Sequence, residues 1–235
     1  DASSAEQVFD LGRALALDGL VITGPDGAAL KPENPVSGRA RSSFELKLTQ
    51  PGTYQFSIVS KSVFGSYSLN GETKRFRGNA DTYQKDVPAG ATDVKVSTMS
   101  SRVEAYTSLG QPNDRVLQPV AEGLQVLPQS SPSELIAGEK TVFIAYIDGK
   151  PAADLEVRVI PGGARFRGVL KDVAYKTGPD GRFEVTWAEG NLYNVVASYP
   201  PRAPQAEGAG GAGARGGDMP ARRLSYSGTF EVQPF

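Results

Sequence analysis

The feature that most constrains this chain is an alternation of apolar and polar side chains, repeated along most of its length. Phe44, Leu46 and Leu48, for example, alternate with Glu45 and Lys47. A β-strand projects successive side chains to opposite faces, so this pattern is typical of strands with one buried face. The alternation recurs in the segments 54–58, 142–146, 155–159, 183–187, 195–199 and 224–232. We therefore predict an all-β protein.

Turn sequences separate these segments. Asn70-Gly71 is a strong short hairpin signal, and Asp148-Gly149 is of the same type. Proline, aspartate and glycine follow one another in 24–27 and again in 178–181, an order typical of tight turns. Only Ala5–Leu17 has apolar residues near helical spacing, and Gly12 interrupts it, so a helix and an irregular strand both stay open there.

A connector rich in turn residues divides the chain. It runs from Leu109 to Gly123 and contains Pro112 and Pro119. The cleaner alternation beyond it predicts two β-sandwich domains of immunoglobulin or transthyretin-like type, at residues 1–123 and 124–235. Residues 200–222 include a long Gly-Ala run. Such a run buries too little surface to offset its ordering entropy, so we predict a flexible insert between two strands of a hairpin.

Two absences in the composition narrow the chemistry. The 235 residues include no Cys and no His. Thiolate nucleophiles, zinc–thiolate sites and the commonest general base near neutral pH are therefore missing. Oxygen ligands alone hold nickel, cobalt or zinc poorly compared with imidazole or thiolate, so we expect no metal site and no cofactor.

Charge and hydropathy exclude two further classes of partner. The net charge of −1 argues against a general nucleic-acid binder. No stretch approaches the roughly 20 apolar residues of a membrane-spanning helix. The first residues carry no signal-peptide pattern, and we expect an exported protein whose signal peptide is not part of this sequence.

Two clusters of arginine and phenylalanine are the candidate binding residues. A guanidinium beside an aromatic ring holds anionic or aromatic ligands best where both are partly desolvated, so we expect the clusters beside a groove. The alternative is the wet face of an edge strand, where charge discourages aggregation. The candidate ligand-binding residues are Arg75, Phe76, Arg77, Arg165, Phe166 and Arg167.

The carboxylates give no comparable signal. Asp26, Asp148 and Asp180 each precede glycine in an expected turn, where aspartate is favoured for backbone reasons. Carboxylates that are distant in sequence can still meet in space, so a glycan hydrolase with paired carboxylates stays open as an alternative. We predict no catalytic residues and expect a protein that is not an enzyme.

Several motifs together resemble a bacterial periplasmic family of unknown function. The resemblance covers essentially the whole chain and is carried by the segments 17–27, 52–54, 74–78, 87–91, 148–152, 159–163 and 180–183. Some members of that family are described as periplasmic components of nickel or cobalt uptake, and many lie beside TonB-dependent receptors. The second half also resembles transthyretin-like and carboxypeptidase-regulatory-like domains.

The resemblance implies a periplasmic, non-enzymatic accessory or binding protein linked to uptake of a metal or metal complex. Its partner would be a metal chelate or an envelope transport protein. Relatives carry histidines near the segments matching 11–13 and 131–132, and this chain has none. A structural or adhesive module of the envelope is the second reading.

Overall fold

The fold is all-β, as the alternation predicts. The computed structural model describes residues 1–5, 8–79, 82–201 and 220–235. Two four-residue helices, α1 (Tyr83–Asp86) and α2 (Ala164–Arg167), accompany the strands. The strands of the first half are β1 (Ser3–Ser4), β2 (Arg13–Ala14), β3 (Leu20–Thr23), β4 (Ala29–Leu30), β5 (Glu33–Ser37), β6 (Ser42–Glu45), β7 (Gly52–Leu69), β8 (Glu72–Gly78) and β9 (Thr92–Leu109).

The second half has shorter strands that pack into a sandwich. They are β10 (Leu124–Pro128), β11 (Leu135–Ile136), β12 (Lys140–Ile147), β13 (Lys150–Pro151), β14 (Glu156–Pro161), β15 (Val173–Lys176), β16 (Arg182–Thr186), β17 (Asn191–Tyr199) and β18 (Arg222–Gln233).

Both hairpin signals of the sequence are confirmed. Asn70 and Gly71 have φ values of 53° and 81°, and Asp148 and Gly149 have 51° and 74°. Positive φ at both central residues belongs to the turn whose twist matches that of paired strands. The first turn joins β7 to β8, and the second joins β12 to β13.

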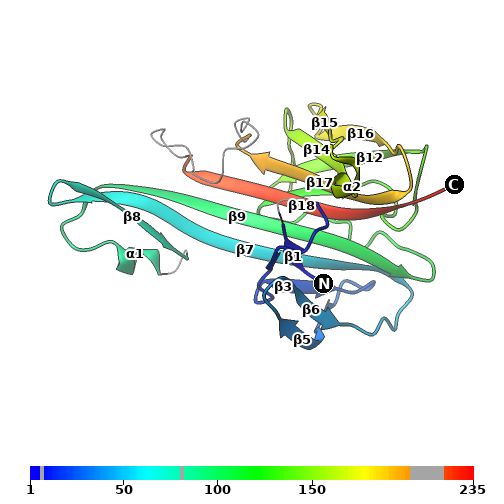
Figure 1. Ribbon diagram of the computed structural model, residues 1–235, viewed down its shortest axis with the longest axis horizontal. Coiled ribbons are helices and arrows are strands. Elements are labelled where there is room, and N and C mark those ends of the chain that lie inside the picture. Colours follow the sequence, from blue (N-terminus) through cyan, green and yellow to red (C-terminus); the bar gives the residue numbers. More distant parts are fainter. Residues whose placement is uncertain (6–7, 80–81, 202–219) are drawn as a thin grey trace.

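A long ribbon of two strands runs the length of the molecule (Figure 1). β7 and β9 pair antiparallel from Gly52 and Leu109 to Ser68 and Thr92. One end of the ribbon, with β8 and α1, projects beyond the rest of the protein (Figure 1). The other end lies between the N-terminal strands and the C-terminal sandwich.

The last strand joins the two halves of the chain. β18 lies between β17 and β9 and pairs with β9 in parallel, from Arg222 opposite Thr98 to Thr229 opposite Ala105. The large sheet therefore has the order β15-β14-β17-β18-β9-β7-β3-β4, with β8 and β11 attached at β7 and β18. The division at Gly123 stays a prediction, and backbone hydrogen bonding crosses it.

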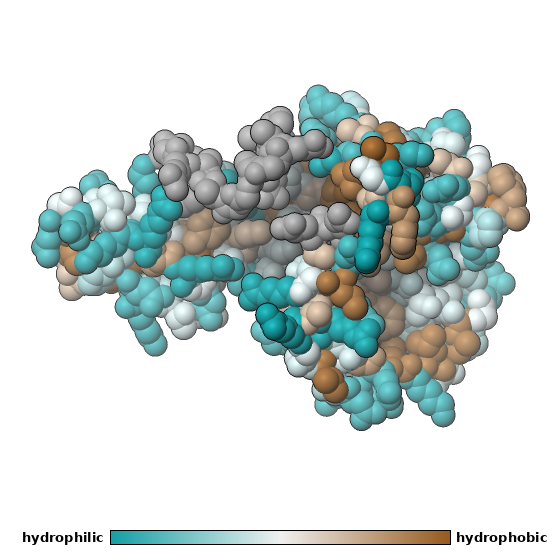
Figure 2. Space-filling model, in the orientation of Figure 1, coloured by the Kyte–Doolittle hydropathy of each residue, from teal (hydrophilic) through white to brown (hydrophobic). Residues whose placement is uncertain are grey.

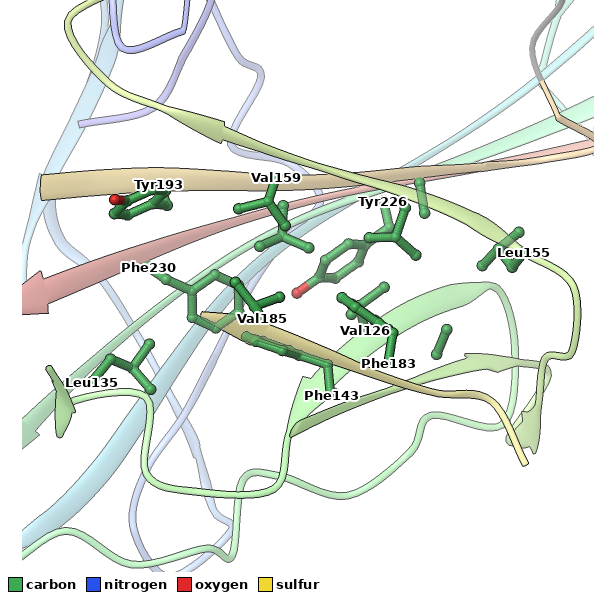
Figure 3. Close-up of a cluster of buried hydrophobic side chains, with 14 of the residues drawn as sticks. Val126, Leu135, Phe143, Leu155, Val159, Phe183, Val185, Tyr193, Tyr226 and Phe230 are labelled. Atoms are coloured by element: carbon green, nitrogen blue, oxygen red, sulfur yellow. The ribbon is translucent and has the colours of Figure 1, made fainter. Parts of the chain in front are cut away.

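The main core fills the space between this sheet and a smaller one made of β10, β12, β13 and β16. Phe143 packs edge-on to Phe230, with ring centroids 5.4 Å apart, and stacks on Phe183 at the same distance. Trp187 is 1% exposed, and its indole nitrogen donates a hydrogen bond of 2.8 Å to Thr141. Figure 3 shows Phe143, Phe183 and Phe230 meeting between the two layers.

Three remaining expectations concern the ends and the insert. The described part of Ala5–Leu17 forms no helix; β2 lies there and pairs with β1. Residues 202–219 of the predicted flexible insert lie outside the described residues. β17 and β18 on its two sides pair antiparallel, from Tyr199 opposite Leu224, which confirms the hairpin. Neither helix of the described chain is long or apolar enough to cross a membrane.

Candidate functional site

The face of the large sheet turned away from the main core forms the floor of a cavity. Phe56 of β7 pairs with Ala105 of β9, which pairs with Thr229 of β18, which pairs with Asn194 of β17. Side chains that are directly opposite one another across neighbouring strands share one face. The floor therefore changes from apolar at β7 to polar at β17.

The N-terminal part of the chain forms the walls. The Phe44 ring packs against the floor, with its centroid 5.9 Å from that of the Phe56 ring. The cavity is open on one side and has a volume of about 860 Å³, within the usual range of small-molecule sites. The apolar side chains larger than alanine that line it are Val8, Phe9, Leu11, Leu15, Leu20, Phe44, Leu46, Leu48, Phe56, Ile58, Val103 and Leu192.

The polar end of the floor is held in place by its own hydrogen bonds. Asn194 Nδ2 donates to Ser227 Oγ at 2.9 Å and to the Gly228 carbonyl at 3.3 Å. Thr229 lies beside them in the lining. These groups offer neutral donors and acceptors to a ligand.

The charge of the lining is one-sided. Lysine and arginine are both absent from the described lining residues, whereas Asp1, Asp10 and Glu104 are present. Asp1 forms an ion pair of 3.3 Å with Arg41. A buried anion without a counter-charge is strongly disfavoured. The cavity therefore disfavours a ligand whose inserted part is anionic.

A buried carboxylate lies under the same floor, on the opposite face of the sheet. Glu104 is 1% exposed and accepts hydrogen bonds from Gln125 at 2.9 Å, Arg102 at 3.0 Å and Tyr106 at 2.9 Å. Burial raises the pKa of the Glu104 carboxyl, although the Arg102 guanidinium acts to lower it. The cluster joins β9 to β10 and is closed to solvent, so it acts as a structural link.

A second, smaller hollow of about 360 Å³ lies where β9 and β18 end. The hydroxyls of Ser108 and Ser133 are 2.7 Å apart there, and Ser108 also donates to Thr53 Oγ1 at 3.2 Å. This chain of neutral hydroxyls holds the segment before β11 against β9. Among the residues that the structure describes, no three acidic, His or Cys side chains form a group able to hold a metal ion.

The structure does not bring the two predicted arginine clusters together. Arg75, Phe76 and Arg77 lie on β8, at the projecting end of the ribbon, whereas the other cluster is α2 at the sandwich (Figure 1). Phe76 is 9% exposed and stacks on Tyr83, with ring centroids 6.0 Å apart. It is therefore a core residue of the ribbon, and its arginine neighbours are exposed.

The side chains of the second cluster, Arg165, Phe166 and Arg167, point in different directions. Arg167 folds back and donates to the carbonyls of Gly162, Pro161 and Leu170. Phe166 points to solvent and is 89% exposed, and Arg165 is exposed beside it. None of the six predicted residues belongs to the lining of the large cavity. Their role in ligand binding stays a prediction.

Sequence reasoning missed the cavity itself. Its floor comes from the alternating segments, for which we predicted one face buried in a core and one face in water. The one available signal was the apolar run Phe44, Leu46 and Leu48, which continues past β6 into a segment that forms no strand. Apolar residues outside a strand must find another surface to cover.

The fold and the cavity together define an all-β protein with a large, mostly apolar cavity on one face of its main sheet. Sequence comparison adds the family: the chain belongs to the family described as Domain of unknown function (DUF4198), which it matches over residues 1–200. The matched span includes the floor residues of β7, β9 and β17, and β18 follows it. No curated protein matches the chain.

Proposed function

We propose that this protein is a non-enzymatic binding protein of the bacterial periplasm, which holds an uncharged, largely apolar organic molecule between the large sheet and the N-terminal segment. The cavity of about 860 Å³ is the observation that supports this proposal. Its twelve apolar side chains offer the surface, and the Asn194–Ser227 pair offers a fixed polar end. Burial of apolar area from both partners supplies the binding free energy.

The link to metal uptake follows from the resemblance to periplasmic uptake proteins. A chain without His or Cys is poorly equipped to grip nickel or cobalt directly. Recognition of the organic shell of a metal complex avoids that difficulty. A lining without lysine or arginine disfavours an anionic complex, so we favour one whose outer surface is neutral, with the metal ion enclosed by its chelator.

Binding of an uncharged dye tests the cavity directly. N-phenyl-1-naphthylamine becomes fluorescent in an apolar site, and we expect saturable enhancement at one site per chain. Ala105→Phe places a ring on the cavity floor and should abolish the enhancement, because Ala105 lies between Phe56 and Thr229. The matched control is Ala174→Phe on the exposed face of β15, which should bind dye as the original protein does.

Competition between ten-carbon compounds tests the charge argument separately. 1-Decanol should displace the dye at a concentration about tenfold lower than decanoate does, because the carboxylate has no cation to meet in the lining. Absence of dye binding would contradict the proposed site. Equal displacement by decanoate would contradict only the charge assignment. Mass spectrometry of protein purified from its native envelope would then identify the natural ligand.

A further inference from the structure

A short segment between β14 and β15 exposes an unusual density of apolar side chains. Phe166 is 89% exposed, Val169 55%, Leu170 37% and Val173 49%. Most exposed apolar residues of folded proteins are scattered singly, whereas grouped ones mark a surface that binds something. In Figure 2 an apolar patch lies over α2 and β15, with hydrophilic side chains beside it.

Two glycines and the hydrogen bonds of Arg167 fix the conformation of this segment. Gly163 and Gly168, on the two sides of α2, have φ values of 81° and 72° and allow the sharp turns there. The Arg167 guanidinium, half-buried beneath the turn, bonds the carbonyls of residues on both sides, Pro161 at 3.2 Å and Leu170 at 3.4 Å. A preformed turn loses little conformational entropy when its apolar side chains enter another medium.

The charges around the patch are positive. The residues 164–173 carry three cations and one anion, a balance of 3 − 1 = +2. Asp172, the anion, is paired with Arg158 at 2.9 Å. Arg165 and Lys171 are exposed beside the apolar side chains. Exposed apolar groups with flanking cations match a lipid interface, where acyl chains lie beneath anionic headgroups.

We propose that the segment 164–173 is a membrane-contact loop, which inserts Phe166 shallowly into a bilayer surface that contains anionic lipids. The loop adjoins the wall of the large cavity: Gly162 donates a 2.7 Å backbone hydrogen bond to Leu192, and Phe9 lies against the same glycine. Leu192 and Phe9 both line the cavity. Membrane contact at this point would hold the cavity close to a source of apolar molecules. The proposal stands on the loop alone and does not require the cavity to be occupied.

A fluorescence experiment places the loop in the bilayer. Phe166→Trp adds a reporter at the exposed tip, and the natural Trp187 is buried and serves as a constant background. With vesicles of phosphatidylglycerol and phosphatidylcholine in equal amounts, the emission should shift to the blue. The matched control is Val36→Trp on β5, which is 60% exposed and lies on the N-terminal part of the molecule, and its emission should stay unchanged (Figure 1).

Sedimentation with the same vesicles measures the contribution of the side chain. Phe166→Ser should weaken the partition coefficient about tenfold or more, because a phenyl ring no longer leaves water. Pure phosphatidylcholine vesicles should bind the original protein more weakly than the mixed ones. An unshifted Phe166→Trp spectrum would overturn the proposal and leave a protein partner as the better occupant of this patch. Equal sedimentation of Phe166→Ser would overturn it as well.

Discussion

The two faces of the large sheet are built from the same strands but are covered differently. On the sandwich face, Tyr226 and Phe230 of β18 are 2% and 1% exposed and meet the second sheet. On the cavity face, Ser227 and Thr229 of the same strand line an open hollow. One face is packed against a complete layer of strands, and the other is covered only by short segments of the N-terminal region.

The difference shows that alternation creates two surfaces without deciding how each is filled. The sandwich face is covered by four strands, so its side chains interdigitate to the density of a normal core. The cavity face is lined instead by Ser3 and Ser4 of β1, Phe44 of β6 and residues between the N-terminal strands, and β1 and β6 each belong to a small two-stranded sheet. An unfilled apolar surface is where a ligand gains most from binding.

The largest expected effect compares equivalent truncations on the two faces. Phe230→Ala should lower the free energy of unfolding by about 3–5 kcal/mol, because it empties a site in contact with Phe143 and Tyr106. Phe56→Ala, on the cavity face, should cost about half as much or less, because its ring is only half-buried. Urea denaturation measures both. Equal losses would mean that the cavity face is packed as tightly as the core.

The next effect concerns the carboxylate beneath the cavity floor. Glu104→Ala should lower the free energy of unfolding by about 3 kcal/mol, because it leaves Arg102 and Gln125 without a partner in a buried site. Glu104→Gln should cost less, since one acceptor oxygen remains. Burial raises the pKa of this carboxyl, so its ionisation opposes folding as the pH rises through the raised value. A variant with Gln should lose that part of the pH dependence, and retention of it would show that another group is responsible.

The sequence alone predicted the strands and the two hairpins, but it did not predict which strands pair across the large sheet. Asn70-Gly71 and Asp148-Gly149 act through local backbone preferences, so their turns follow directly from the residues. The parallel pairing of β18 with β9 brings together residues more than a hundred positions apart. Alternation specifies which way a side chain points and carries no information about which strand lies beside it.

The candidate site was out of reach for the same reason. Phe56, Asn194 and Thr229 come to lie on one face only after the four strands β7, β9, β18 and β17 pair. The arginine clusters were visible because each is local in sequence. Their locality also explains why the structure leaves them at separate places, one on β8 and one on α2 (Figure 1).

A smaller effect on the free energy of unfolding should appear at acid pH. It comes from the ion pair between Arg222 and Asp148. Arg222 bonds both oxygens of Asp148, at 2.6 and 2.7 Å, and Gly123 N donates to the same carboxylate. The Arg222 hydrogen bonds, together with that of Gly123, lower the pKa of Asp148 to about 2. The stabilisation is complete above the unfolded pKa of about 3.9 and is lost as the pH falls through 2.

Exposure limits the size of that effect. The side chains of Arg222 and Asp148 are 41% and 38% exposed, so the pair contributes at most about 1 kcal/mol. Asp148→Asn should lower stability at pH 6 and bring the unfolding curves of variant and original protein together near pH 2. Curves that stay equally far apart at both values would show that the carboxylate charge is unimportant and that the Gly123 hydrogen bond matters instead.

The smallest effect is expected at the arginines of the projecting ribbon. Arg75 and Arg77 are exposed on β8, and Phe76 between them is buried and stacks on Tyr83. Replacing both arginines by Ala should change the free energy of unfolding by less than about 0.5 kcal/mol, as exposed sites usually do. Dye binding in the cavity should also stay unchanged, because these residues lie outside its lining.

Growth under metal limitation provides the decisive comparison with a full gene deletion. A deletion that impairs growth, together with a double variant that impairs it equally, would establish the ribbon cluster as a recognition surface in its own right. A double variant that grows normally in the same strain would leave the cavity face as the candidate functional surface, since Arg75 and Arg77 then contribute neither to stability nor to uptake.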